Sequence, residues 1–170
     1  MSEQQPKPAF REIRAVYDAE GIIVYQAFNA EIAKAAVETQ RLDASPLYRT
    51  RMTWIKPSWC WMLYRSGYSY KDANQSNTLA IKVSHEGFKH LLSISKLDGG
   101  RANPLDMVRL GIPSNLIRRW IDEWIVGIED VTERARELRR VLDEEERIER
   151  EELVRRGLVL EERVYEVSED

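Results

Sequence analysis

The chain has 170 residues, of which 43% are apolar and 32% are charged. This length and composition suit one domain with a buried core and exclude a wholly disordered chain. No run approaches the roughly 20 apolar residues that a membrane-spanning helix requires, so no membrane partner is expected. The single cysteine, Cys60, excludes an intrachain disulfide and fits the reducing environment of the cytoplasm.

The net charge of −3 is unevenly distributed along the chain. Residues 129–170 carry 16 acidic and 9 basic side chains, whereas residues 1–128 carry 13 acidic and 17 basic ones. A mildly acidic protein does not favour a broad DNA-binding face, because such a face needs a clear excess of basic side chains. The basic excess in the first part of the chain still allows a local anion site there.

The polar, proline-containing start of the chain lacks the apolar core of a secretory signal. It predicts a disordered tail over residues 1–10, followed by one domain over residues 11–167. The first elements of that domain are two strands, at residues 13–17 and 22–25, which are rich in isoleucine, valine and tyrosine. Because the residues between them are typical of a turn, the two strands are predicted to pair as a hairpin.

The middle of the chain predicts two helices and a strand. Asn29 is suited to cap a helix that runs to about residue 40, and residues 51–55 predict a third strand. Pro57 and Ser58 then mark the start of a second helix, near residues 59–65. Six successive residues of this helix are apolar or aromatic, so it is predicted to be buried on most sides.

The second half of the chain begins with a strand at residues 78–83, which a capped helix follows, and Ser114 is predicted to cap another helix. A long helix is predicted from residue 130 to 156. Residues 143–152 are almost wholly charged, and the charged end of the helix, residues 143–157, is expected to face solvent or to project from the domain. Residues 158–167 are predicted to return as an edge strand. Together these elements predict an α+β fold, with a small mixed or antiparallel sheet, helices packed on it and a long charged C-terminal helix.

The stretch from Ala44 to Lys71 contains five cations and seven aromatic side chains but no acid. Such cations need counter-charges, which come either from acids elsewhere in the fold or from a bound anion. The helix predicted after Pro57 presents unpaired N–H groups next to Lys56, and this arrangement favours an anion. Strand alternation is predicted to place Arg51 on the same strand face as Thr53, and nearby aromatic rings can stack a base.

The segment is therefore predicted to bind a phosphate-bearing ligand, either a nucleotide or an RNA end. The alternative is that its tryptophans are core residues and that its arginines pair with Asp18, Glu31 or acids of the last helix. No Gly-rich phosphate loop or dinucleotide fingerprint is present. The predicted ligand-binding residues are Arg14, Tyr25, Arg51, Trp54, Lys56, Arg65, Tyr68 and Lys71.

The sequence does not identify catalytic residues or a metal site. His85 and His90 are five residues apart, which does not place them on one helix face as a pair of metal ligands. Cys60 lies among aromatic residues in the predicted second helix, so it is expected to be inert packing and not a nucleophile. The sequence carries no signal for an oligomeric state.

The blocks IRAVYD at residues 13–18, RMTWIKPS at residues 51–58 and MLYRSGY at residues 62–68 resemble the bacterial and fungal family called domain of unknown function 4291. The resemblance covers about residues 13–165, and residues 51–58, RMTWIKPS, are its most specific block. It implies a shared fold unit without an assigned activity. Family members generally carry an acid after the glutamine that matches Gln75, where this chain has Ser76. If that acid is catalytic in relatives, this chain binds its ligand without turning it over.

Two other functions are compatible with the sequence. The first is an ADP-ribosyltransferase-like enzyme that uses NAD, because a short strand bearing Arg14, nearby aromatics and an acid before a later strand resemble that fold's general plan. The second is a non-catalytic protein-interaction module that uses the charged C-terminal helix.

Overall fold

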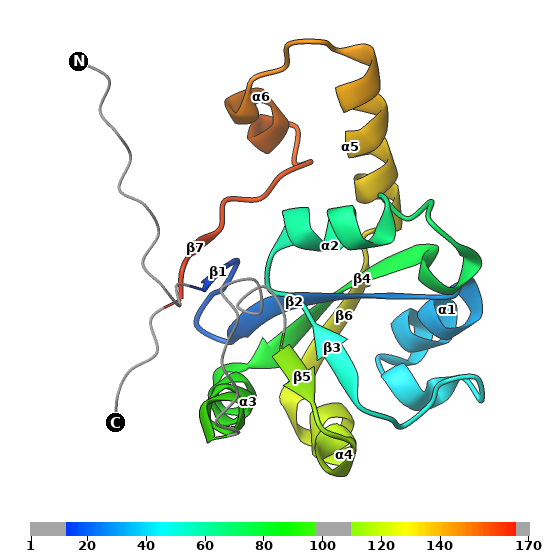
Figure 1. Ribbon diagram of the computed structural model, residues 1–170, viewed down its shortest axis with the longest axis vertical. Coiled ribbons are helices and arrows are strands. Elements are labelled where there is room, and N and C mark those ends of the chain that lie inside the picture. Colours follow the sequence, from blue (N-terminus) through cyan, green and yellow to red (C-terminus); the bar gives the residue numbers. More distant parts are fainter. Residues whose placement is uncertain (1–12, 98–109, 166–170) are drawn as a thin grey trace.

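The computed structural model describes residues 13–97 and 110–165 (Figure 1). Its central sheet has three antiparallel strands in the order β2-β4-β6, formed by Gly21–Phe28, Asn77–Ser84 and Ile125–Asp130. β2 pairs with β4 along its whole length. The fold is therefore α+β with small antiparallel sheets, as predicted. The predicted tail over residues 1–10 lies outside the described residues.

Two short antiparallel strand pairs lie beside this sheet. They are β1 (Arg14–Ala15) with β7 (Arg163–Val164), and β3 (Thr53–Ile55) with β5 (Leu110–Ile112). The predicted hairpin of the first two strands forms only beside its turn, where Tyr17 bridges Ile22. β1 pairs with β7 instead, so the beginning and the end of the described chain lie side by side (Figure 1).

Helices cover both faces of the sheet. They include α1 (Ala30–Thr39), α2 (Trp59–Ser66), α3 (His85–Leu97), α4 (Ile117–Arg119), α5 (Thr132–Glu144) and α6 (Arg150–Arg155). α2 and α5 pack on one face, and α1 and α3 on the other. Alternation along β2 explains this division, because Val24 belongs to the core under α1 and α3, and Tyr25 to the core under α2 and α5. No helix in the described ranges combines the length and the apolar character that a membrane span needs.

The local signals for the ends of α1 and α2 are confirmed. The prediction that Ser114 caps a helix was wrong, because Ser114 begins a 3-10 turn, Ser114–Leu116, that has no side-chain cap. The side chain of Asn29 accepts a hydrogen bond from the backbone N–H of Ile32 at 2.9 Å, and α1 begins directly after it. Ser58 caps α2 in the same way, through the backbone N–H of Trp61. Gly67 ends α2 in the left-handed conformation, with φ of 55°, which a glycine adopts without steric cost.

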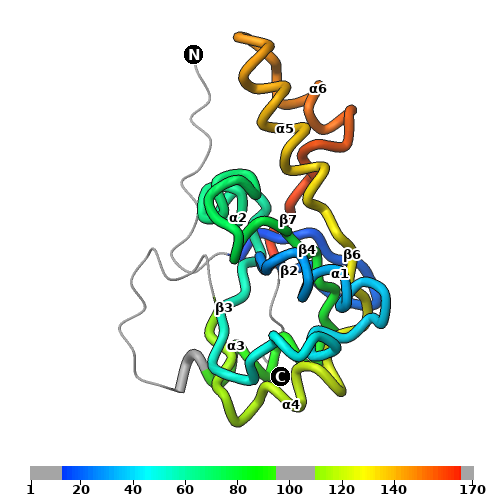
Figure 2. The backbone as a smooth tube through the Cα atoms, turned by 90° about the vertical axis from the view of Figure 1, so that its right-hand side faces the viewer, coloured from blue at the N-terminus to red at the C-terminus, as the bar shows by residue number. Residues whose placement is uncertain are grey.

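The prediction of one long helix over residues 130–156 was wrong. α5 ends at Glu144, and the chain turns back through residues 145–149 into the short helix α6. The apolar stripe of the helix stops where the acidic run begins, so a straight continuation has nothing to pack against. The turn instead buries Leu153 and Leu158 against Val141. α5 and α6 lie side by side and extend beyond the rest of the domain (Figure 2).

Candidate ligand-binding surface

α2 presents two different faces. The buried face packs on β2 and consists of Trp59, Met62, Leu63 and Ser66. The opposite face is exposed and consists of Cys60, Trp61, Tyr64 and Arg65. The prediction that this helix is buried on most sides was therefore wrong. Its apolar residues continue around the helix, but only one face meets the sheet, so Trp59 is core and Trp61 is not.

Glu162 occupies the N-terminal end of α2. Its carboxylate accepts a hydrogen bond from the backbone N–H of Trp59 at 2.7 Å. Burial raises the pKa of the Glu162 carboxyl, whereas this hydrogen bond and the charges of Arg150 and Arg14 act in the opposite direction. The anion position predicted at this helix end is thus filled by a side chain of the protein itself. Glu162 lies 103 residues after Trp59, so no local sequence pattern points to it.

Tyr25 and Lys56, two of the predicted ligand-binding residues, are joined through their backbones. The N–H of Tyr25 donates to the carbonyl of Lys56 at 2.7 Å, and the reverse hydrogen bond measures 3.1 Å. The Tyr25 ring is buried, with its centroid 5.2 Å from that of Trp59, and burial raises the pKa of its hydroxyl. Tyr25 therefore supports the junction of β2 and β3 from inside, whereas Lys56 is half-buried.

The short strand β3 is hydrogen-bonded to the buried side chain of Gln26 on one side, and its Trp54 side chain is exposed. The Gln26 amide nitrogen donates to the hydroxyl of Thr53 at 2.9 Å and to the carbonyl of Trp54 at 3.0 Å. The Trp54 ring lies against Gly111 of β5, where an added Cβ would come within 3.2 Å of the ring. Arg51 lies in a bend before the strand, so it does not share a strand face with Thr53 as predicted. The pairing with β5 covers only three residues and leaves Arg51 outside it.

The loop after α2 has an unusual backbone. Gly67, Tyr68 and Ser69 are all left-handed, with φ of 55°, 57° and 67°. This conformation costs a residue with a Cβ of order 1 kcal/mol or more, so other contacts must hold the loop. One such contact is the Arg139 guanidinium, which lies 5.3 Å from the centroid of the Tyr68 ring. Tyr68 is therefore half-buried beneath a cation.

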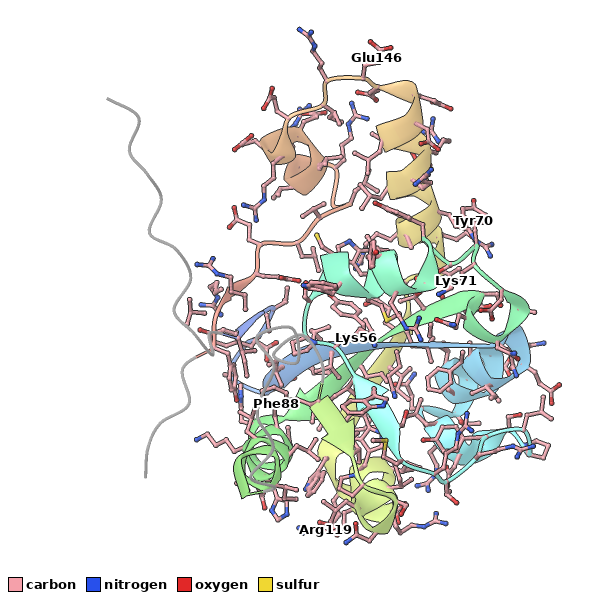
Figure 3. The ribbon with its side chains drawn as sticks, viewed as in Figure 1. Lys56, Tyr70, Lys71, Phe88, Arg119 and Glu146 are labelled. Carbon is pink, nitrogen blue, oxygen red and sulfur yellow. The ribbon has the colours of Figure 1, made fainter. Side chains whose placement is uncertain are left out.

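Arg136 of α5 holds the same loop further along. Its guanidinium donates to the carbonyls of Ser69 and Ser76, at 3.3 Å each. It also lies 5.0 Å from the centroid of the Tyr70 ring. Tyr70 and Lys71 are both exposed and lie beyond the C-terminal end of α2, whereas Lys56 lies at the end of β3 (Figure 3). Ser76 thus contributes its backbone carbonyl to the contacts by which Arg136 holds this loop.

Four cations of the segment lack an ion pair within residues 13–97 and 110–165: Arg49, Arg51, Arg65 and Lys71. Arginines elsewhere in these ranges commonly pair with acids, and nine do so. Glu31, one of the acids considered as alternative partners, accepts a hydrogen bond from the Ser45 hydroxyl at 3.5 Å, and the others are engaged in ion pairs elsewhere. Asp18 pairs with Lys82 at 2.6 Å, and the acids of α5 pair mainly with arginines of the same helix.

The exposed face of α2 also borders a hollow. An open pocket of about 420 Å³ is lined, among the described residues, by Cys60, Trp61 and Tyr64. Cys60 is exposed and not packed in the core, and partial burial raises the pKa of its thiol. At neutral pH the thiol therefore stays protonated, which makes it a poor nucleophile.

The sequence profile of one family, described as Domain of unknown function (DUF4291), matches residues 12–103 and 96–165. The chain belongs to this family. The family description names no activity, so membership supports the fold unit and does not indicate a reaction or a ligand. No curated protein and no solved structure matches the chain.

Proposed function

We propose that the protein binds a phosphate-bearing ligand, a nucleotide or an RNA end, on one surface built by β3, the exposed face of α2 and the loop after α2. We call it the α2–β3 surface; its residues are Arg49, Arg51, Trp54, Trp61, Tyr64, Arg65, Tyr70 and Lys71. α2 and β3 lie on the same side of the molecule, which faces the viewer in Figure 1 and the left in Figure 2.

The observation that carries the proposal is the coincidence of unpaired cations with exposed aromatic rings. The exposed fractions are 40% for Trp54, 39% for Trp61, 79% for Tyr64 and 63% for Tyr70. Every exposed aromatic side chain of the described ranges is among these four. Exposed apolar rings beside cations without counter-charges are typical of a site for a ligand that carries both a base and a phosphate.

The roles of the predicted residues follow from their positions. Arg51, Arg65 and Lys71 are proposed to bind phosphate, because each is exposed and without an ion pair in the described ranges. Stacking is assigned to the exposed rings of Trp54 and Tyr64, since Tyr68 is half-buried. Of the other predicted residues, Tyr25 and Lys56 are proposed to support the surface from within, and Arg14 belongs to the surroundings of Glu162.

A thermal-shift panel tests the proposal. Its ligands are ATP, GTP, their diphosphates, NAD, short RNA and inorganic phosphate. NAD also tests the hypothesis of an ADP-ribosyltransferase-like enzyme. A ligand at 100 times its dissociation constant adds about 2.7 kcal/mol of stability. We expect a clear shift that Arg51→Ala or Arg65→Ala abolishes.

Arg155→Ala is the matched control, because Arg155 is exposed but lies on α6 and pairs with Glu152. An equal loss of the shift in this variant would indicate a non-specific charge effect. A flat panel for the unaltered protein would refute the proposal. We place this binding in the cytoplasm, where a thiol as exposed as that of Cys60 stays reduced.

A further inference from the structure

The exposed aromatic rings of the α2–β3 surface stand at three separate places. Trp54 lies on β3, Trp61 and Tyr64 lie on α2, and Tyr70 lies in the loop beyond the end of α2. The rings of Trp61 and Tyr64 meet edge to face, with centroids 5.9 Å apart and planes at 83°. Their flat faces therefore point in different directions, and one base cannot stack on both. A mononucleotide would use one of these places and leave the others unoccupied.

Each place with an aromatic ring also has a cation close by in the chain. Arg65 is adjacent to Tyr64, Lys71 is adjacent to Tyr70, and Arg51 precedes Trp54 by three residues. A single strand of nucleic acid alternates bases and phosphates in the same manner. No acid lies between residues 44 and 71, so nothing within the segment repels a chain of phosphates.

The ring at the far end of the surface is held in place before any ligand binds. The Arg136 guanidinium lies on the Tyr70 ring at 5.0 Å and fixes the loop through the carbonyls of Ser69 and Ser76. A strained, left-handed backbone precedes this ring and has few alternative conformations. A ring fixed in this way can stack a base with little loss of side-chain entropy.

We infer that the ligand of the α2–β3 surface is single-stranded nucleic acid several nucleotides long; this inference rests on the proposed function. Flat aromatic faces accept unstacked bases, which a duplex does not offer. The net charge of −3 also does not favour the broad phosphate contacts of duplex binding. Because base stacking is tolerant of sequence, the binding has weak base preference.

Fluorescence anisotropy with labelled oligouridylates of 2, 4, 8 and 12 nucleotides tests the inference on the full chain. We expect affinity to rise at least tenfold between 2 and 8 nucleotides and then to level off. Three contributing cations, Arg51, Arg65 and Lys71, predict that log K falls with log salt with a slope of about −2. An oligothymidylate of 8 nucleotides separates RNA from DNA, and either one binding as a single strand supports the inference.

Tyr64→Ala and Tyr64→Phe form a matched pair at the most exposed ring. We expect Tyr64→Ala to weaken binding of the 8-nucleotide strand about 5- to 100-fold, and Tyr64→Phe, which keeps the ring, to change it less than twofold. Tyr70→Ala tests, by the same binding measurement, whether the ring in the loop after α2 also stacks a base. Tyr64 touches little besides Trp61, so the unfolding temperatures of the two Tyr64 variants should match that of the unaltered protein.

Three results would overturn the inference. If uridine monophosphate binds as tightly as the 8-nucleotide strand, the site takes a mononucleotide and the proposed function stands alone. If a duplex of the same length binds equally well, the rings are not used for stacking. If neither strands nor the mononucleotides of the thermal panel bind, the inference and the proposed function fail together.

Discussion

The carboxylate of Glu162 accepts a hydrogen bond from the backbone N–H of Trp59, across 103 residues of chain. The indole N–H of the same tryptophan donates to the carbonyl of Leu158 at 2.9 Å. Trp59 thus ties the C-terminal segment to the start of α2 at two points. The end of the chain completes a helix whose exposed face forms the centre of the α2–β3 surface.

This cap predicts a stability effect at Glu162. Glu162→Ala removes the acceptor and leaves the N–H of Trp59 unpaired, so we expect the free energy of unfolding to fall by about 1–2 kcal/mol. Urea denaturation measures the change. Glu161→Ala is the control, because Glu161 is the exposed neighbour, and it should leave the free energy nearly unchanged. Equal effects of the two substitutions would show that the cap contributes nothing.

The same carboxyl predicts a dependence on pH. Burial raises the pKa of Glu162 above its ordinary value of 4.5, so in this range the folded chain binds the proton more tightly than the unfolded chain. The stabilising contribution is therefore complete below pH 4.5 and is lost as pH rises through the folded-state pKa. We expect the stability of the unaltered protein, relative to Glu162→Gln, to decline between pH 4 and pH 8. A difference that stays flat or rises over this interval would contradict the raised pKa.

Arg136 is predicted to fix the loop that carries Tyr70 and Lys71. Arg136→Ala removes two hydrogen bonds to carbonyls and the contact with the Tyr70 ring, so we expect a loss of about 1–3 kcal/mol. Arg140→Ala on the same helix is the control, because Arg140 is exposed and pairs only with neighbouring glutamates. Hydrogen exchange of the loop amides should rise in the first variant alone. Unchanged hydrogen exchange of the loop amides in Arg136→Ala would contradict the prediction that Arg136 fixes this loop.

Substitution of glycine by alanine is expected to affect stability differently at Gly87 and at Gly127. A Cβ at Gly87 would lie 2.3 Å from the ring of Trp124, which is buried, whereas a Cβ at Gly127 would meet nothing closer than 3.9 Å. Gly87→Ala should therefore destabilise by about 1–3 kcal/mol, although alanine is the better helix former. Gly127→Ala should change stability by less than about 1 kcal/mol. Thermal denaturation that shows no difference between them would mean that Trp124 moves freely.

The sequence by itself determined the features that depend on neighbouring residues. Asn29, Ser58 and Gly67 mark helix ends because a cap needs only a side chain and the next turn of backbone. The apolar patterns of residues 22–25 and 78–83 predict the strands β2 and β4. The absence of acids from residue 44 to 71 is likewise a property of the sequence alone.

Only the tertiary structure decided which partners these elements meet. The two faces of α2 are both rich in apolar residues, so the sheet beneath, and not the sequence pattern, selected Trp59 for the core and left Trp61 exposed. Glu162 lies at the start of α2, and α6 packs beside α5. Both arrangements form because burial against residues distant in the chain outweighs the local preference for one continuous helix. Such pairings depend on contacts between residues far apart in the chain, for which a single sequence carries no local signal.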